Sequence, residues 1–313
     1  MSDFLGIDTS NYTTSVAIYN SESCTVTQEK LLLPVKDGEL GIRQSDAVFH
    51  HVKNLPILFE RLFKIKTSIS GIGVSSRPRN IEGSYMPCFL AGESFSKSLG
   101  AVENISVDFT SHQVGHILAA LYSCGRLDLV NEKFIAFHVS GGTTDCLLVE
   151  PDSNEIIKAK QIASSLDLKA GQAVDRVGVM LGLKFPCGKE LEQLALKSER
   201  TFKIKPTLKN LDCSLSGIEN KCKKMFMAGE KKEDIALFCI QYILEAIDEM
   251  TKRVIDSCGR LPVVYAGGVM SNTIIKGKLT KKYSGFFSSP EFSCDNAAGV
   301  AIFSALKSLR RNI

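Results

Sequence analysis

Two histidines spaced four residues apart, His112 and His116, are the residues of this sequence best suited to chemistry. The chain has only five histidines among 313 residues, so a pair at this spacing is uncommon by chance. Residues i and i+4 share one face of a helix, where two imidazoles can bind one metal ion. No glutamate follows His112, so the zinc-protease motif with its general base is not met. The alternative is a pair of helix-surface histidines without a metal.

A metal site needs a third ligand, and Asp295 in the segment Ser293–Gly299 is the candidate. The same aspartate is suited to cap the last helix, and the two roles are compatible. Two histidines and one carboxylate leave coordination positions open for a substrate oxygen. This donor set suits iron or zinc acting as a Lewis acid.

Three small-residue turns, each after an apolar strand, are candidates for binding phosphate through backbone N–H groups. They are 8–14 (with Asp8, Thr9, Ser10, Asn11 and Thr13), 140–144, and the pair Gly267 and Gly268. A Gly-Gly pair is also common in a plain tight turn. Asp175 is placed to accept from ribose hydroxyls, with a salt bridge to Arg176 or a lysine as the alternative. Neither a Gly-x-Gly-x-x-Gly nor a Walker sequence is present, which argues against a Rossmann dehydrogenase or P-loop NTPase.

The strand–turn–strand pattern of residues 4–19 recurs at 134–149. At an offset of 130, Ser10, Thr13 and Thr14 align with Ser140, Thr143 and Thr144. The shared strand–turn–strand pattern, more than these three identities, favours an ancient duplication. We therefore expect two similar lobes, 1–130 and 131–313, with a cleft between them. The last helix is free to pack back on the first lobe.

Strands and helices alternate along the chain, which predicts α/β lobes. Besides the two strand pairs, the expected strands are 69–75, 105–108 and 261–266. The expected helices are 88–99, 112–122, 170–181, 189–196, 234–258, one following Gly268, and 296–309.

Composition excludes several classes of protein. Hydrophobic residues are 44% and charged residues 23%, so the chain is globular and not disordered, and a net charge of +4 is too small for a polycation. No apolar run approaches the roughly 20 residues of a membrane span. The N-terminal segment lacks the features of a signal peptide, and ten scattered cysteines are typical of reduced thiols. We expect a cytoplasmic enzyme.

Positive charge is concentrated in residues 197–232. This segment holds ten basic against four acidic side chains, a local net charge of +6. Such an excess can bind a phosphate backbone. A solvated lysine-rich helical surface explains the composition equally well.

Seven motifs occur in one order along nearly the whole chain. They are Gly6–Ser10, His112-x-x-Gly115-His116, Val139–Gly142, Ala170-Gly171-x-Ala173-x-Asp175, Leu211-Asp212-x-Ser214-x-Ser216-Gly217, Ala266–Val269 with Asn272, and Pro290–Phe292 with Asp295-Asn296. In these seven motifs and their order, the sequence resembles the tRNA threonylcarbamoyladenosine transferase family, formerly called O-sialoglycoprotein endopeptidases. The resemblance implies the duplicated actin/Hsp70/sugar-kinase fold.

The resemblance also implies roles for individual residues. His112, His116 and Asp295 hold the metal, and His138 is either an added ligand or a strand residue buried beside the site. The phosphate of a threonylcarbamoyl-adenylate is bound by Val139, Ser140, Gly141 and Gly142, and its adenosine by Asp175, Gly188, Glu192 and Asn272. An adenosine amine beside the tRNA anticodon attacks the carbamoyl carbon, and AMP leaves. Paralogous or accessory subunits are the partners it implies.

The first turn departs from the family pattern. Tyr12 and Thr13 stand where typical members carry an acidic pair, and Asp145 stands where relatives usually carry an amide residue. These changes are typical of a divergent paralogue, and they leave the acceptor open between the tRNA adenosine, another amine, and no tRNA at all. A non-catalytic nucleotide-binding partner subunit and a metal-dependent hydrolase are the alternative functions.

Overall fold

The computed structural model describes residues 2–10, 12–34, 42–64, 68–293 and 297–311. The chain divides into two units. Unit 1 comprises Met1–Asn131, Pro151–Ala159 and Cys294–Ile313, and unit 2 comprises Glu132–Glu150 and Lys160–Ser293. The first unit is therefore assembled from three separate stretches of sequence.

Unit 1 contains a mixed five-stranded sheet in the order β3-β2-β1-β4-β5. The strands are β1 (Asp3–Asp8), β2 (Thr13–Asn20), β3 (Thr25–Leu32), β4 (Ile69–Arg77) and β5 (Val107–Ser111). The first three strands are antiparallel neighbours, whereas β4 and β5 run parallel to β1. The predicted strand pair at the start of the chain is thus confirmed as β1 and β2.

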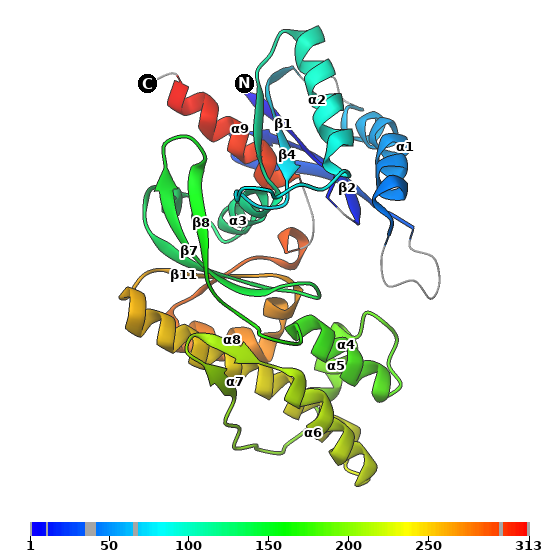
Figure 1. Ribbon diagram of the computed structural model, residues 1–313, viewed down its shortest axis with the longest axis vertical. Coiled ribbons are helices and arrows are strands. Elements are labelled where there is room, and N and C mark those ends of the chain that lie inside the picture. Colours follow the sequence, from blue (N-terminus) through cyan, green and yellow to red (C-terminus); the bar gives the residue numbers. More distant parts are fainter. Residues whose placement is uncertain (1, 11, 35–41, 65–67, 294–296, 312–313) are drawn as a thin grey trace. The chain divides into compact units, whose positions relative to one another are not determined.

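Four helices pack with this sheet: α1 (Gln44–Leu62), α2 (Phe89–Glu103), α3 (His112–Ser123) and α9 (Ala298–Arg311). Side chains alternate along β1, so Leu5 and Ile7 join one core with Leu55 of α1 and with Phe95 of α2. The intervening Gly6 lies against α9, as Figure 1 shows for the strand and helix. The two faces of the sheet are therefore covered by helices from opposite ends of the chain.

Close backbone contact replaces side chains where α9 crosses its neighbours. A Cβ on Gly299 would overlap the carbonyl oxygen of Gly115 in α3, and one on Gly73 would overlap that of Val300. Glycine is needed at these crossings because any side chain would hold the elements apart. These glycines let α3 lie directly on α9.

Unit 2 contains a five-stranded sheet in the order β12-β11-β6-β7-β8. Counted from β8 to β12, this order repeats that of unit 1, with β6 in the place of β1. Its strands are β6 (Phe134–Val139), β7 (Thr144–Asp152), β8 (Ile156–Ser164), β11 (Val263–Ala266) and β12 (Phe286–Phe287). The pair β6 and β7 is antiparallel, and β11 and β12 run parallel to β6. The shared order confirms the predicted duplication of the strand pair at the level of topology.

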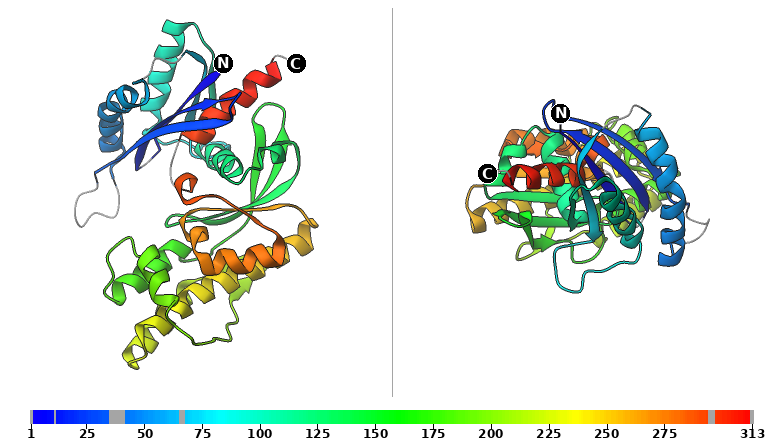
Figure 2. Two further views of the ribbon diagram at one scale, coloured as in Figure 1. Left: turned by 180° about the vertical axis from the view of Figure 1, so that it is seen from behind. Right: turned by 90° about the horizontal axis from the view of Figure 1, so that it is seen from above.

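The helices of unit 2 are α4 (Ala170–Met180), α5 (Gly188–Ala195), α6 (Ser216–Met227), α7 (Lys232–Cys258) and α8 (Thr273–Tyr283). A short hairpin, β9 (Thr207–Lys209) and β10 (Asp212–Ser214), precedes α6. The long α7 lies beside α8 (Figure 2). It is central to the unit 2 core, which also takes in Ile135 and Phe137 of β6. The helix predicted over 234–258 from apolar residues at helical spacing is thus confirmed.

Two further expectations concern the whole chain. Within the described residues, no helix is long and apolar enough to cross a membrane. The nine cysteines described by the structure are free thiols, most of them buried, as predicted for reduced cysteines used as small hydrophobic residues.

The crossing of α3 and α9 yields a prediction with an internal control. We expect Gly299→Ala to lower the free energy of unfolding by more than about 2 kcal/mol, because the added methyl has no room. Gly277 is also helical, but it is exposed and a Cβ there would meet nothing within 4 Å. Gly277→Ala should therefore stabilise by up to about 1 kcal/mol. Urea unfolding of both variants checks this, and equal effects would contradict it.

Candidate functional site

Asp8 ends β1 as a buried carboxylate with three partners. Its Oδ1 accepts from the Ser10 backbone N–H at 2.9 Å and from the Ser75 hydroxyl at 2.8 Å. Its Oδ2 lies 2.6 Å from His112 Nδ1. Because a carboxylate only accepts, Nδ1 carries a proton, so Nε2 is the nitrogen whose lone pair can bind a cation. The predicted phosphate-turn residue Asp8 thus orients an imidazole.

The predicted histidine pair is brought together on α3. Ser111 caps this helix by accepting from the Val114 N–H, so His112 opens the first turn. The Nε2 atoms of His112 and His116 lie 2.9 Å apart, and their ring planes are inclined at 81°. Two lone pairs approach this closely only with a proton or a cation between them. An imidazole oriented by a carboxylate is the usual arrangement at a metal, so this donor set fits a divalent ion.

Two further residues, Asp295 and His138, are predicted metal ligands. Asp295 lies outside the described residues. His138 is half-buried on β6, directly opposite Asp145 of β7 in the strand register. Within the part of the chain that the structure describes, no group of three His, Cys, Asp or Glu side chains could hold a metal ion. The roles of Asp295 and His138 stay predictions.

The rest of the first turn is committed to the fold of unit 1. The Thr9 hydroxyl donates to the Cys88 carbonyl at 3.0 Å and accepts from the Gly92 N–H at 3.1 Å, which ties the turn to α2. Ser10 and Thr13 are buried, and Asn11 lies outside the described residues. The sequence predicts the turn, but it does not reveal the hydrogen bonds by which the Thr9 hydroxyl holds the turn to unit 1.

His51 of α1 supports the same turn and was not singled out by sequence reasoning. The Thr14 hydroxyl lies 2.9 Å from His51 Nδ1 and accepts from Asn54 Nδ2 at 3.1 Å. Burial lowers the pKa of His51 to about 4, and the nearby Asp8 charge offsets only part of that effect. His51 is therefore a neutral imidazole at physiological pH, and it packs beneath the turn.

The second turn, Ser140–Thr143, lies at the N-terminus of α4. Ser140 N donates to the Thr143 carbonyl at 2.8 Å, and the Ser140 carbonyl accepts from Gly171 N at 3.1 Å. A Cβ on Gly171 would come within 2.6 Å of Gly141 Cα, so glycine is needed for this contact. The Thr144 hydroxyl accepts from Ala170 N at 2.9 Å. These contacts use the N–H groups of Ser140, Ala170 and Gly171, and they hold Gly141 beside the N-terminus of α4, a setting that suits an anion.

One pocket of unit 2, about 620 Å³ in volume, collects most of the predicted nucleotide residues. Its lining includes the predicted Gly141, Asp175, Gly188, Glu192, Gly268 and Asn272. Of the other predictions, Val139, Ser140, Gly142 and Gly267 do not line it. The buried Val139 packs by its backbone against Gly267, and Ser140 contributes the turn described above.

The polar groups of this pocket are held in place by neighbouring backbone. Asp175 Oδ1 accepts from Cys187 N at 2.8 Å, and Glu192 Oε1 accepts from Thr273 N at 2.7 Å. Arg176, the alternative partner of Asp175, instead pairs with Glu219 at 2.9 Å. Asn272 caps α8 through its side-chain oxygen. Each carboxylate is thus anchored by one oxygen, which preorganises the second for a ligand.

Sequence reasoning missed the apolar wall of the pocket. That wall is formed by Val174, Ile240, Ile243, Val269 and Ile275, with Pro186 and Pro290 nearby. Two of these residues come from α7, whose helical spacing was recognised, but the spacing does not tell which face borders a cavity. An apolar wall with a few fixed polar groups is typical of a site for a small organic ligand.

Comparison with known proteins identifies the family. The sequence profile of TsaD, described as tRNA N6-adenosine threonylcarbamoyltransferase, matches residues 30–302. The chain belongs to this family. Proteins of that name from Buchnera aphidicola (subsp. Schizaphis graminum) and Legionella pneumophila (strain Corby) are 29% and 31% identical to it. The first alignment covers 97% of this chain and 92% of the relative, and the second 98% and 94%. The predicted family is confirmed, and its named members are transferases, as expected.

Solved structures support the predicted fold. Component A of the Acidaminococcus fermentans (R)-2-hydroxyglutaryl-CoA dehydratase matches with a TM-score of 0.57 and 16% identity, over 99% of this chain and 100% of that one. Full-length HypF in its phosphate- and nucleotide-bound form matches with a TM-score of 0.61 and 14% identity, over 98% of this chain and 56% of that one. At such identities the likeness concerns the fold alone. It confirms the α/β, actin/Hsp70/sugar-kinase-like class.

The anchoring of His51 predicts a pH effect on stability. An unfolded histidine has a pKa near 6.5, whereas that of folded His51 is about 4. Between pH 6.5 and 4 the unfolded chain therefore binds a proton at this histidine and the folded chain does not. The free energy of unfolding should therefore fall by about 3 kcal/mol as the pH drops through this window. His51→Asn should remove that part of the loss, whereas His50→Asn should retain it. Urea unfolding at pH 7, 5.5 and 4.5 checks this, and identical slopes for both variants would contradict it.

The pocket glycines yield a second prediction. A Cβ on Gly268 would meet nothing within 4 Å, so only a bound ligand would contact it there. We expect Gly268→Ala to fold with unchanged stability but to bind AMP at least 10-fold more weakly, as measured by calorimetry. The adjacent Gly267 has a φ of +100° and packs on Val139, so Gly267→Ala should instead lower the melting temperature. Unchanged AMP affinity in Gly268→Ala would exclude Gly268 from the ligand site.

Proposed function

We propose that this chain transfers a threonylcarbamoyl group from an adenylate donor to an amine, the preferred acceptor being adenosine next to the tRNA anticodon. The pocket of unit 2 is the observation that carries the proposal. Six residues predicted to hold the adenylate lie around it, although they come from four separate stretches of the sequence. The description of the family names the threonylcarbamoyl group and the tRNA adenosine, which supports this transferred group and this acceptor.

The pocket and the adjacent turn divide the binding of the donor between them. The apolar wall, with Ile240 and Ile243, would pack against the adenine ring. Asp175 and Glu192 would accept from the ribose hydroxyls through their second oxygens. The N–H groups of Gly141 and Gly142, in the turn beside the N-terminus of α4, would bind the phosphate. Gly141 fits this role because a Cβ there meets no protein atom.

The histidine pair would hold a divalent ion, iron or zinc. His112 is already oriented by Asp8, and His116 faces it at 2.9 Å. Asp295 is the proposed anionic ligand, and His138 a proposed additional one. When bound, the ion would supply a Lewis acid that orients and polarises the phosphate of the donor.

The transfer itself requires positioning more than covalent chemistry. The acceptor amine attacks the carbamoyl carbon, a carbon–nitrogen bond forms, and the bond from that carbon to the phosphate oxygen breaks. AMP departs with the electron pair, and the amine proton passes to solvent. The donor is held rigidly by anchored carboxylates and backbone N–H groups, which is the main contribution such a site can make.

The acceptor side of the site differs from the family pattern. Tyr12 is exposed, and Thr13 is buried at the start of β2, where typical members carry two acids. The exposed edge of the first turn is thus aromatic and neutral instead of anionic. This supports the alternative of a divergent paralogue, whose acceptor is an amine other than the tRNA adenosine.

The basic segment 197–232 is the proposed tRNA surface. All ten of its lysine and arginine side chains are exposed, on the loop before β9, on the β9–β10 hairpin, on α6 and at the start of α7. Of these, Arg200 is paired with Glu230 and with Asp234, the latter at 3.7 Å. The exposed Phe226 at the end of α6 offers a face for base stacking. We expect this activity in the cytoplasm, together with accessory subunits of a tRNA-modifying complex.

The decisive experiment supplies the donor and the acceptor directly. The protein, loaded with iron or zinc, is incubated with freshly made threonylcarbamoyl-adenylate and unmodified tRNA, and the nucleosides are analysed by mass spectrometry. We expect threonylcarbamoyladenosine from the wild type, and at least 100-fold less from His112→Ala and from Gly268→Ala. The triple variant Lys221→Glu/Lys223→Glu/Lys224→Glu should bind tRNA more weakly, with a shallower dependence on salt.

The possible results separate the proposed transferase from the two alternative functions. AMP binding without any product, even with the partner proteins of a relative present, would favour a non-catalytic partner subunit. Release of AMP without transfer to tRNA would favour a hydrolase. Modification of a small amine but not of tRNA would retain the transferase and replace its acceptor.

A further inference from the structure

Ser271 lines the pocket of unit 2, and none of the proposed contacts with the donor involves it. It ends the short 3-10 helix η2 (Gly268–Ser271), which connects β11 to α8. Its Oγ is withdrawn from solvent and has no hydrogen-bond partner within the part of the chain that the structure describes. A buried hydroxyl without a partner is unfavourable, because it has given up its hydrogen bonds with water. Ser271 thus keeps a hydrogen-bonding capacity that the free chain does not use.

The anchored polar side chains around the pocket differ from Ser271 in this respect. Asp175 and Glu192 are each bonded to protein through one oxygen. Asn272 Oδ1 accepts from two N–H groups in the first turn of α8, at 3.1 and 3.2 Å. These hydrogen bonds hold each of the three side chains in one orientation. No hydrogen bond opposes a rotation of the Ser271 hydroxyl between staggered positions about the Cα–Cβ bond.

The backbone that carries Ser271 is fixed in place. Met270 N donates to the Gly267 carbonyl at 3.0 Å, and Asn272 N donates to the Val269 carbonyl at 3.2 Å. The Met270 side chain is buried in the unit 2 core, which attaches η2 to the rest of the unit. Only the side chain of Ser271 is left to adjust, and its hydroxyl can both donate and accept. A ligand in the pocket can therefore gain a hydrogen bond here without movement of the backbone.

The place of Ser271 in the pocket wall favours the base of a nucleotide over its ribose or phosphate. Its neighbours Val269 and Ile275 belong to the apolar wall. The carboxylates proposed for the ribose, Asp175 and Glu192, come instead from α4 and α5. A hydroxyl in an apolar wall has a large effect on which ring binds. A ring that lacks the matching polar atom leaves this hydroxyl unpaired, and its binding is weakened for that reason.

We propose that Ser271 is a specificity-determining residue whose hydroxyl forms a hydrogen bond with one polar atom on the edge of the adenine ring. The inference rests on the proposed function, which places an adenine nucleotide in this pocket. The apolar wall by itself would accept any flat ring of similar size, because apolar contact is not directional. The hydrogen bond distinguishes adenine from such rings, and it gives Ser271 Oγ the partner that it lacks in the free chain.

The first test measures the binding of AMP to the full chain by calorimetry, without added metal. We expect Ser271→Ala to bind AMP about 5-fold more weakly than the wild type does, because one hydrogen bond is lost. The melting temperature of the free protein should not fall, since the hydroxyl has no partner there. An unchanged AMP affinity would overturn the proposal. A lower melting temperature of free Ser271→Ala would also overturn it, because the hydroxyl would then serve the fold.

Four analogues of AMP identify the atom that the hydroxyl contacts. Purine riboside 5′-monophosphate lacks the exocyclic amine, and the 1-deaza, 3-deaza and 7-deaza analogues each carry a C–H group in place of one ring nitrogen. The analogue without the contacted atom should bind the wild type and Ser271→Ala with affinities within about 2-fold of each other. The other three should keep the difference seen with AMP. If all four keep it, the hydroxyl only shapes the pocket, and the proposal is wrong.

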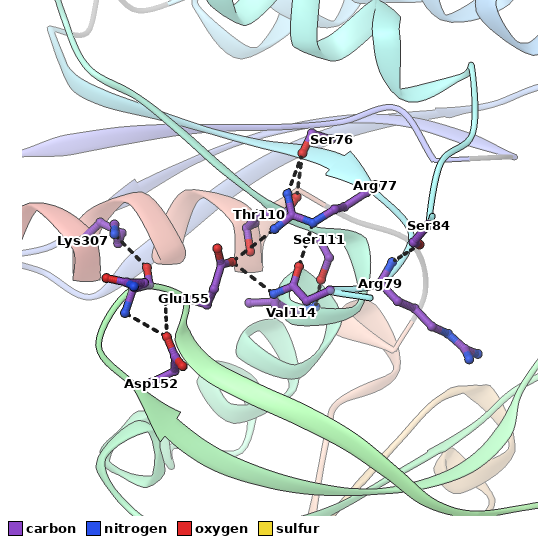
Figure 3. Close-up of polar contacts among 12 residues, drawn as sticks. Ser76, Arg77, Arg79, Ser84, Thr110, Ser111, Val114, Asp152, Glu155 and Lys307 are labelled. Atoms are coloured by element: carbon purple, nitrogen blue, oxygen red, sulfur yellow. Dashed lines mark hydrogen bonds and ion pairs between the residues drawn. The ribbon is translucent and has the colours of Figure 1, made fainter. Parts of the chain in front are cut away.

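A matched control removes a buried, unpartnered hydroxyl from unit 1. Thr110 of β5 is buried, and its Oγ1 has no hydrogen-bond partner among the described residues. Its carbonyl accepts from the Ser76 hydroxyl at 3.3 Å, as Figure 3 shows. Thr110→Val retains this backbone contact and the shape of the side chain, so it should bind AMP as the wild type does. An equal loss of AMP affinity in Thr110→Val and in Ser271→Ala would contradict a specific role for Ser271.

Failure of this inference can be told apart from failure of the proposed function. If AMP binds the wild type and Ser271→Ala equally well, the pocket still holds the nucleotide and only the role of Ser271 is lost. If AMP does not bind the wild type at all, the proposed function fails, and the role of Ser271 fails with it.

Discussion

A single buried carboxylate organises the chemistry of unit 1. Asp8 accepts from the backbone of its own turn, from Ser75 of the neighbouring strand, and from His112 of a helix more than 100 residues away. A buried carboxylate is stable only when its oxygens are satisfied, so these three donors and the acid require one another. The hydrogen bond to His112 then determines which imidazole nitrogen is left to face His116. The sheet, the turn and the helix are thereby positioned around one candidate ion site.

The ligand site of unit 2 is built from different kinds of contact. Its turn and pocket rely on close backbone approach at Gly171 and Gly267, and on carboxylates that are anchored by one oxygen. Apolar side chains of α7 supply the remaining wall. The duplicated topology therefore carries two unlike sites, one built from titratable side chains and one from backbone and shape.

Much of this arrangement could be predicted from the sequence because its signals are local. The strand pairs, the spacing of His112 and His116, and the long apolar periodicity of α7 each depend only on neighbouring residues. The helix α1 was not predicted, although Ala47, His51, Leu55, Leu58 and Leu62 recur at helical spacing. In α6 only Ile218 and Cys222 are buried, so a lysine-rich surface hides its periodicity. The pocket wall and the contacts of Asp8 arise from tertiary packing, which no local pattern encodes.

The route of the chain through unit 1 has a consequence for its synthesis. One face of the β1–β5 sheet is covered by α9, and the small residues Gly6 and Gly73 on that face have no other partner of comparable closeness. The ribosome makes α9 only after the whole of unit 2 has been translated. Unit 2 can therefore complete its core while unit 1 still shows a bare glycine-lined surface. The nascent protein must keep that surface from pairing with other chains until its last described helix emerges.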